Sequence, residues 1–263
     1  MSGYVDIHAH VLPGIDDGPA ELDGALEMLR TAAGCGISTI VATPHVRSDF
    51  PDVHVPELAG RCQALRDRIA GEDLGLELVC GAEVSLVWAV DASDEQLRLV
   101  TYGQRGTDVL IETPLATTAG LDTLLYELRV RGLRVTLAHP ERSREFQRDP
   151  SPLAELVTRG ILLQVNADSV LGNGRRSATA KLGIALCRDG LSHALASDAH
   201  RAESWRPVSR LAEAVEAVTA LVGPDRAHWM ASDAPAAILA GTELPEAPPV
   251  VSSHRRRWPW SRR

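Results

Sequence analysis

Residues 6–18 read DIHAHVLPGIDDG, and this stretch decides what kind of fold the rest of the chain must form. It follows directly on a short β-rich run and supplies His8, His10, Asp16 and Asp17. In an extended segment, side chains two residues apart point the same way, so His8 and His10 can hold one metal ion together. The stretch predicts a strand whose C-terminal end carries metal-binding side chains.

The same arrangement recurs along the chain. Segments of helical periodicity separate seven predicted strands, which are Tyr4–Ile7, Ile37–Ala42, Leu76–Cys80, Asp108–Ile111, Arg134–Leu137, Leu162–Val165 and His193–Ala196. The motifs ATPH, CGAE, IETP, AHPER, QVNAD and ASDAH follow the later strands and supply His45, Glu83, Glu112, His139, Glu141, Arg142, Asn166, Asp168, Asp198 and His200. Seven βα units in series predict an α/β fold with a parallel sheet.

Two architectures fit such a sheet, a closed barrel and an open doubly wound sheet. In a barrel, the C-terminal ends of all strands converge on one face, which carries the active site. In an open sheet, they lie along an edge, and only the switch point forms a crevice. Because metal-binding residues follow nearly every strand, the pattern favours the barrel.

The types of these residues indicate the chemistry. Mixed histidine and carboxylate ligands suit Zn, Mn or Fe. Nine candidate ligands are too many for one ion, so we expect two or three metal ions. Such centres typically hydrolyse phosphate esters or amides. Arg142 and Arg206 follow His139 and His200 closely, and a planar guanidinium binds phosphate oxygens in pairs. The two arginines therefore favour a phosphate substrate.

The motifs DIHAHVLPGIDDGP, ATPH, GAE, IE, AHPER and SDAH, in this order, resemble the polymerase-and-histidinol-phosphatase (PHP) superfamily. More narrowly, they are similar to its bacterial protein-tyrosine phosphatases of capsule and exopolysaccharide gene clusters. The resemblance covers about residues 4–241. It implies a distorted (β/α)7 TIM-like barrel with the site at the C-terminal ends of the strands, and a trinuclear centre of Mn, Zn or Fe.

The resemblance also implies a role for each matching residue. His8 and His10 would bind the first metal with Asp198 and a bridging Glu83. Glu112 and His139 would complete the second metal site. Asp17, rather than Asp16, would bind the third metal with His45 and His200. Arg142 and Arg206 would hold the phosphate, and Asp198, His200, Arg142 and Arg206 would be catalytic.

Such enzymes dephosphorylate the tail of a membrane-associated tyrosine kinase, which implies that kinase as the partner. A phenolate leaving group has a pKa near 10 and needs less protonation than an alkoxide. His200 or a metal-coordinated water could supply the proton. A small-molecule phosphoesterase such as histidinol-phosphate phosphatase is the alternative function, and a catalytically inactive kinase-binding protein is a third.

A second phosphatase signature occurs in the chain. Cys62 and Arg68 match the C-x5-R pattern of cysteine-dependent tyrosine phosphatases. Those enzymes place the cysteine in a loop at a helix N-terminus. Here Cys62 lies on the apolar stripe of a predicted helix, so we expect a buried structural thiol.

Composition limits the partners and the location. The net charge is −8, and residues 1–253 carry 22 basic against 35 acidic side chains, which argues against nucleic-acid binding. With no export signal and scattered cysteines, we expect a cytoplasmic protein with reduced thiols. We expect a barrel over residues 1–241 and a flexible Pro/Arg/Trp tail over 242–263. Trp258, Trp260 and the tail arginines could contact the inner membrane face.

Overall fold

A computed structural model describes residues 3–116, 119–172 and 177–251 of the chain. Within these ranges the strands are β1 (Tyr4–Ala9), β2 (Ile37–Ala42), β3 (His45–Val46), β4 (Glu77–Cys80), β5 (Glu83–Ser85), β6 (Asp108–Glu112), β7 (Arg134–Ala138), β8 (Leu162–Asn166) and β9 (Ala194–Ala196). The longer helices are α1 (Leu22–Gly34), α2 (Leu58–Ile69), α5 (Leu121–Val130), α7 (Ser151–Thr158), α9 (Ala178–Arg188) and α10 (Arg210–Val222).

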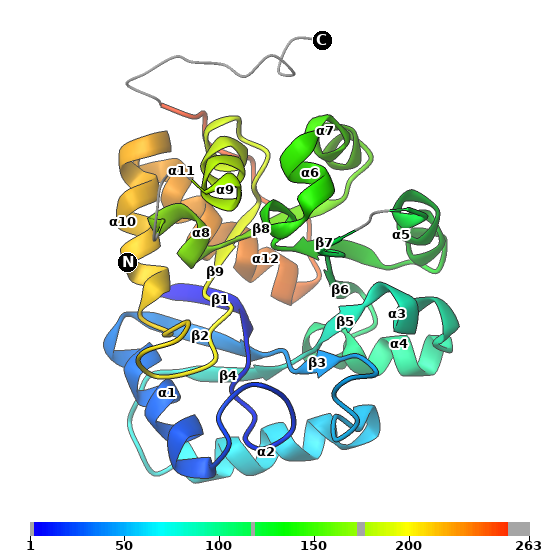
Figure 1. Cartoon of the computed structure of the whole chain (residues 1–263). Coiled ribbons are helices and arrows are strands. Elements are labelled where there is room, and N and C mark those ends of the chain that lie inside the picture. The colour runs from blue at the N-terminus through cyan, green and yellow to red at the C-terminus, as the bar shows by residue number, and fades with distance from the viewer. Residues whose placement is uncertain (1–2, 117–118, 173–176, 252–263) are drawn as a thin grey trace.

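Shorter helices complete the connections between these elements. They are α3 (Leu86–Asp91), α4 (Asp94–Val100), α6 (Arg144–Arg148), α8 (Ala167–Leu171), α11 (Pro224–His228) and α12 (Ala234–Ala240), with single turns at η1 (Val55–Glu57), η2 (Tyr102–Gln104), η3 (Pro140–Arg142) and η4 (Trp229–Asp233). The strands lie at the centre of the molecule and the helices surround them (Figure 1).

The strands close into a distorted barrel. One sheet has the order β1-β2-β4 and the other β3-β5-β6-β7-β8-β9, with every pairing parallel. The ends meet where Ala9 bridges Ala199, and the Asp198 amide donates to the His8 carbonyl at 2.9 Å. The predicted (β/α)7 barrel is therefore confirmed, with its final closure made by residues of the predicted site.

The distortion has a local cause. The second and third predicted strands form as β2 and β4, and each is followed, after a break at Thr43–Pro44 or at Gly81–Ala82, by a short strand that was not predicted, β3 or β5. Pro44 has no amide hydrogen and cannot donate to the ladder. At Gly81, a Cβ atom would approach Val41 Cγ1 to 3.1 Å and Tyr102 Cδ1 to 3.2 Å. These breaks turn His45 and Glu83 onto short second strands, which pair with each other.

The pattern of buried residues follows from a central barrel of strands covered by helices. Every residue of β8 is buried, as expected for a parallel strand covered on both faces. The amphipathic helices turn one apolar stripe inward; in α1 this stripe consists of Ala25, Leu26, Met28, Leu29 and Ala32. The resulting core holds the strands in register, and their polar C-terminal ends meet at one place.

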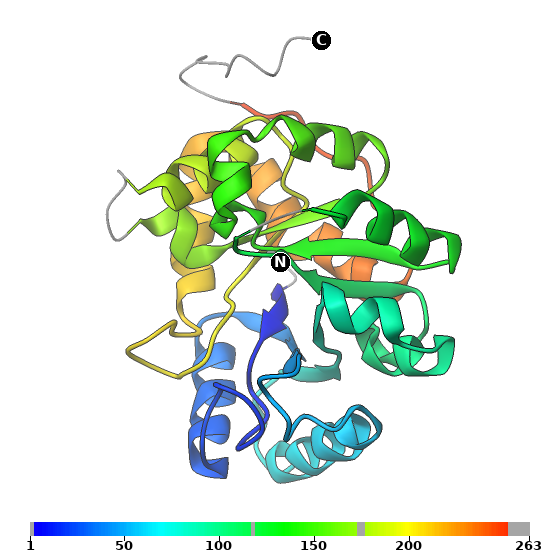
Figure 2. The ribbon, with the colours of Figure 1, turned by 45° about the vertical axis from the view of Figure 1, so that its right-hand side comes forward.

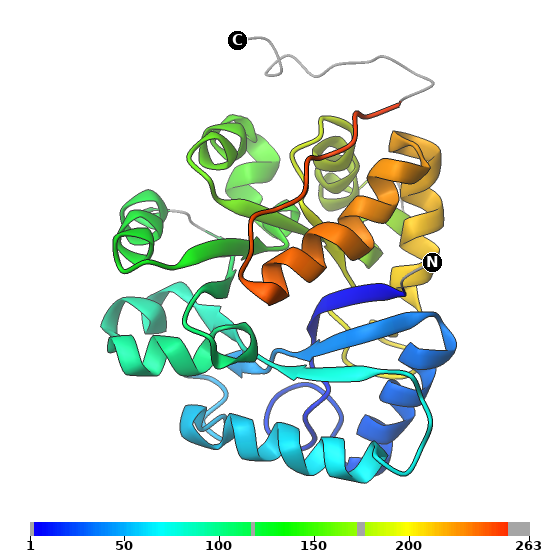
Figure 3. The same cartoon turned by 180° about the vertical axis from the view of Figure 1, so that it is seen from behind.

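The segment after α12 runs back along the outside of the barrel (Figure 3). Residues 242–251, assigned from sequence to a flexible tail, have no helix or strand. They are nevertheless fixed to the barrel, because Trp229 Nε1 donates to the Pro245 carbonyl at 3.0 Å and the Val251 amide donates to Val222 at 2.8 Å. The rest of the predicted tail, residues 252–263, lies outside the described residues. Over the described ranges, no helix is long and apolar enough to cross a membrane.

Candidate metal centre

The barrel brings together all nine predicted metal ligands, His8, His10, Asp17, His45, Glu83, Glu112, His139, Asp198 and His200. Each lies at or just beyond the C-terminal end of a strand, or in the loop after β1. All but two are buried; Asp17 and Glu112 are partly exposed. In four overlapping groups, potential ligand atoms lie within 4.8 Å of one another.

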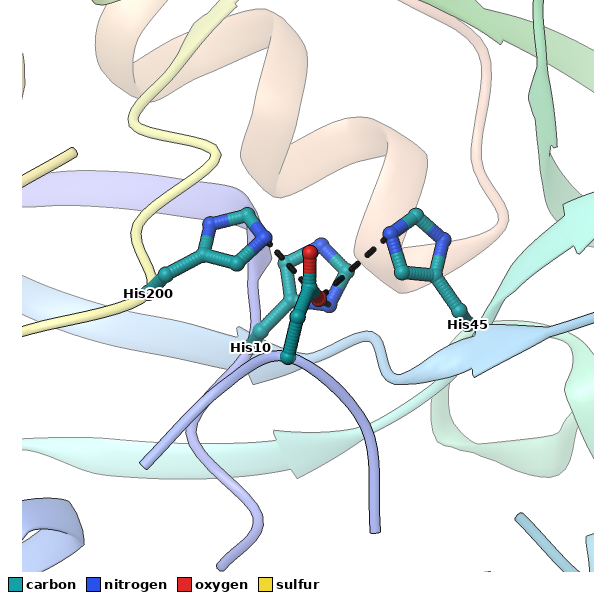
Figure 4. Close-up of side chains that lie close together, drawn as sticks. His10, His45 and His200 are labelled. Carbon is teal, nitrogen blue, oxygen red and sulfur yellow. Dashed lines mark ion pairs between the residues drawn. The ribbon is translucent and has the colours of Figure 1, made fainter. Parts of the chain in front are cut away.

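The first group surrounds Asp17. His200 Nε2 lies 3.1 Å and His45 Nε2 3.7 Å from Asp17 Oδ1, while His10 Nδ1 lies 3.9 Å away. The three imidazoles come from different parts of the barrel and face one another across this point (Figure 4). The third site implied by the resemblance, formed by Asp17, His45 and His200, corresponds to this group.

The second and third groups share His8. His8 Nε2 lies 3.5 Å from Asp198 Oδ1 and 3.3 Å from Glu83 Oε2. His10 Nε2 lies 3.5 Å from each of these two oxygens. Glu83 thus stands between the groups, with its other oxygen 2.8 Å from His139 Nε2. Its position is that of a carboxylate able to bridge two ions.

The fourth group joins His45, Glu83 and Glu112. The resemblance paired Glu112 with His139, whereas the geometry places His139 with His8 and Glu83. Arg47, which sequence reasoning missed, donates to Glu112 Oε1 at 2.7 Å. Arg47 directly follows β3 and reaches Glu112, at the end of β6, only because β5 pairs with both strands. No motif near Arg47 in the sequence indicates this contact.

The donor atoms are arranged as a metal requires. Three histidines have Nδ1 fixed by an acceptor: His8 by Gln164 Oε1 at 3.0 Å, His10 by Asp16 Oδ2 at 2.8 Å, and His200 by the Asp198 carbonyl at 2.8 Å. Each Nε2 then faces the cluster, as in metal sites where the other ring nitrogen of a histidine ligand is held by a hydrogen bond.

Several buried acceptors in the cluster have no hydrogen-bond partner. Glu83 Oε2, Asp17 Oδ1 and His45 Nδ1 are of this kind. His45 Nδ1 lies 2.9 Å from Glu83 Oε2, but their orientation is not that of a hydrogen bond. Unpartnered buried polar atoms are costly, and a bound cation would satisfy all three. The residues present therefore fit metal ions with nitrogen and oxygen ligands.

The electrostatics agree with this assignment. Burial alone would raise the pKa values of Glu83 and Asp198, yet the nearby histidines hold both well below their usual range. Burial would lower the pKa of His10, but Asp16 raises it well above its usual value. These low pKa values favour the ionised form of both carboxylates, which is the form that binds a metal ion.

A second layer of residues supports the ligands. Gln164 Nε2 donates to Asn166 Oδ1 at 2.8 Å, and Asn166 Nδ2 donates to Asp198 Oδ2 at 2.5 Å. This series of hydrogen bonds links His8 to Asp198 through two side-chain amides of β8. Asn166 is among the residues named from the sequence, but Gln164 is not. The two residues lie two positions apart on β8, so the period of a strand places them on the same face.

The two predicted phosphate-binding arginines converge on the centre. Arg142 and Arg206 each place a guanidinium nitrogen near Asp198 Oδ2, at 3.2 and 3.1 Å. Both line a cavity of about 470 Å³ beside the cluster, together with Asn166 and Asp168. The cavity gives a phosphate access to the arginines and leaves room for the group that carries it.

Other polar residues lie elsewhere. His54 is exposed and His193 is partly buried at the opposite end of β9, while His228 pairs with Asp233 on the surface. His254 lies outside the described residues. Cys62 is buried in α2. None of these belongs to the metal-binding groups of the described residues.

A sequence model of the family described as "Capsular polysaccharide synthesis, CpsB/CapC" matches residues 4–240. The chain belongs to the CpsB/CapC family. The resemblance inferred from the motifs is thereby confirmed.

Named relatives of this CpsB/CapC chain are phosphatases. Tyrosine-protein phosphatase YwqE of Bacillus subtilis is 31% identical over 201 residues, covering 76% of this chain and 78% of YwqE. The putative tyrosine-protein phosphatase CapC of Staphylococcus aureus is 30% identical over 197 residues, or 74% and 76% of the two chains.

A solved structure extends the likeness to the whole fold. It comes from a study of YwqE from Bacillus subtilis and CpsB from Streptococcus pneumoniae, described as unique metal-dependent tyrosine phosphatases. It covers 95% of this chain and 100% of its own, with a TM-score of 0.80 and 26% identity. As a CpsB/CapC protein, this chain is a metal-dependent tyrosine-protein phosphatase.

Proposed function

We propose that this chain dephosphorylates the phosphotyrosine tail of a membrane-associated bacterial tyrosine kinase, and so controls capsule or exopolysaccharide synthesis. Two findings support the proposal: the description of the family names capsular polysaccharide synthesis, and relatives carry the name of tyrosine-protein phosphatases. The observation that supports the chemistry best is the convergence of Arg142 and Arg206 beside nine buried or half-buried ligand residues.

The proposal includes two or three divalent or transition metal ions, Mn, Zn or Fe. His8, His10, Asp198 and Glu83 would hold the first. Glu83 and His139 would hold the second, and Glu112, which the structure groups with His45 and Glu83, would complete it as the resemblance implies. Asp17, His45 and His200 would hold the third. Bound ions supply Lewis acidity and activate water for attack at phosphorus.

The chain's own residues would orient the substrate. Arg142 and Arg206 would grip the phosphoryl oxygens, because each guanidinium offers paired donors and both already point at the same carboxylate oxygen. Asn166 would keep Asp198 in place through its amide. His200 has Nδ1 fixed to the Asp198 carbonyl, so its Nε2 is the atom left to bind a metal or to hold a proton for the leaving phenolate.

The location follows from the same proposal. A kinase tail on the inner face of the membrane would place the enzyme in the cytoplasm. The arginines and tryptophans of residues 254–263 would then add a weak attraction to anionic lipid.

Phosphate release by the purified protein tests the activity. A tyrosine-phosphorylated peptide and histidinol phosphate would be compared with added Mn²⁺ and with a chelator. We expect metal-dependent release from the peptide and little from histidinol phosphate. Preference for histidinol phosphate would reject phosphotyrosine as the substrate but would still agree with a metal-dependent phosphatase. Metal binding without hydrolysis of any phosphoester would indicate an inactive binding protein.

The partner needs its own test. An autophosphorylated tyrosine kinase from the same capsule gene cluster would be incubated with the enzyme, and its phosphotyrosine content followed. The Asp198→Asn variant is the control, since it should fold and lose turnover by losing a carboxylate that ties together the metals and both arginines. Persistent phosphorylation of the kinase, with the peptide still hydrolysed, would reject the kinase as the substrate. Elemental analysis of the purified protein tests the number of bound ions.

A further inference from the structure

Trp205 is an exposed aromatic residue at the metal centre. The residue is 52% exposed. One edge meets the ring of His200, with centroids 4.7 Å apart, and Arg206 Cζ lies 4.7 Å from the Trp205 centroid. The indole therefore touches one predicted metal ligand and one predicted phosphate-binding residue while much of its surface faces solvent.

The backbone holds Trp205 in this exposed position. The connection between β9 and α10 projects away from the barrel (Figure 2). Its base is tied by a bridge between Arg201 and Pro207, and by the His200 amide donating to the Arg206 carbonyl at 3.0 Å. The residues on both sides of Trp205, Ser204 and Arg206, have φ of 71° and 49°. Such backbone strain in non-glycine residues tends to cluster at functional sites.

A second aromatic residue provides a useful contrast. Phe50 stacks on His45 with centroids 4.9 Å apart and planes 9° from parallel, and Arg47 Cζ lies 5.1 Å from the Phe50 centroid. Both rings thus contact a predicted metal ligand and a guanidinium, but Phe50 is only partly exposed. Trp205 is 52% exposed beside the arginine expected to hold the phosphate.

We propose that Trp205 is a specificity residue, whose indole packs against the aromatic ring of the phosphotyrosine. This inference rests on the proposed function. A phosphate held by Arg206 would bring its ester group next to the indole, because Arg206 contacts both Asp198 and Trp205. A phenyl ring offers a flat face for stacking, and an alkyl phosphate offers none. Trp205 thus selects aryl phosphates.

Inhibition constants separate a ring contact from an effect on Arg206. Using the metal-loaded enzyme and a phosphotyrosine peptide, the Ki values of phenylphosphonate and inorganic phosphate would be measured. In Trp205→Ala we expect the Ki of phenylphosphonate and the KM of the peptide to rise about 2- to 10-fold. The Ki of inorganic phosphate and kcat should stay within about twofold. Trp205→Phe should restore most of the affinity, and Tyr126→Ala, on exposed α5, is the matched control.

Two results would overturn the inference. An unchanged Ki for phenylphosphonate in Trp205→Ala would show that the indole does not touch the ring. An equal rise for phenylphosphonate and inorganic phosphate would show that Trp205 acts by positioning Arg206. Failure of the proposed function is distinguishable. If only the kinase is not a substrate, the peptide assay still decides the role of Trp205. If the wild type does not hydrolyse the peptide, calorimetric binding of the two inhibitors decides it.

Discussion

Asp16 Oδ2 lies 2.8 Å from Nδ1 of His10, although its neighbour Asp17 is the residue that faces the metal-binding group. Asp16 also accepts the amides of Gly18 at 2.9 Å and His45 at 3.1 Å. One carboxylate thus shapes the loop after β1, links it to β3 and orients a ligand. Asp16 is therefore a positioning residue, whereas its neighbour Asp17 is the predicted metal ligand.

Asp16→Asn should weaken metal binding without removing a ligand. Loss of the carboxylate charge makes the His10 ring a poorer ligand, and such second-layer changes typically cost about 10- to 100-fold in affinity. Activity titrated against free Mn²⁺ should shift to higher concentration and recover at saturation. Asp91→Asn, an exposed position at the end of α3, is the control. An unchanged metal titration would exclude this role for Asp16.

Arg142→Lys and Arg206→Lys should each lower kcat/KM by about tenfold or more, because lysine keeps the charge but loses the paired donors. The double variant should lose less than the product of the two effects, since both side chains contact Asp198 Oδ2. Steady-state kinetics with a phosphotyrosine peptide measures this. Arg159→Lys, at an exposed arginine directly after α7, should leave kcat/KM unchanged. If Arg142→Lys and Arg206→Lys were as active as Arg159→Lys, the two arginines would not bind the phosphate.

The sequence predicted the barrel and the nine clustered side chains because both depend on a local rule. A polar residue directly after a parallel strand has its position fixed by that strand, as for His139 after β7. The supporting contacts obey no such rule. Gln164 reaches His8 and Arg47 reaches Glu112 only after strands distant in sequence have paired. The breaks at Pro44 and Gly81 likewise follow from packing between strands.

Cys62→Ser should leave kcat/KM within about twofold of the wild type, despite the C-x5-R pattern. Contact with Cys80 and burial raise the pKa of the Cys62 thiol, so the nucleophilic thiolate does not form. Arg68 lies exposed on the same helix. Activity assays with and without iodoacetamide would test this. A large loss of turnover in a variant with normal thermal stability would restore the cysteine mechanism.

His193→Gln should make the free energy of unfolding less sensitive to acid. His193 Nδ1 accepts the Leu163 amide at 3.2 Å, and burial beside Arg226 lowers its pKa to about 4. The unfolded chain, with a pKa near 6.5, binds the proton more readily. This contribution to stability is therefore complete above pH 6.5 and is lost as pH falls toward 4. In urea unfolding, the free energy of unfolding should fall between pH 7 and pH 5 by about 1–2 kcal/mol less in the variant than in the wild type. Acid also displaces metals, but it does so in both proteins, so the difference between them isolates the effect of His193. His54→Gln is the exposed control. An equal loss of unfolding free energy in wild type and His193→Gln would refute the assignment.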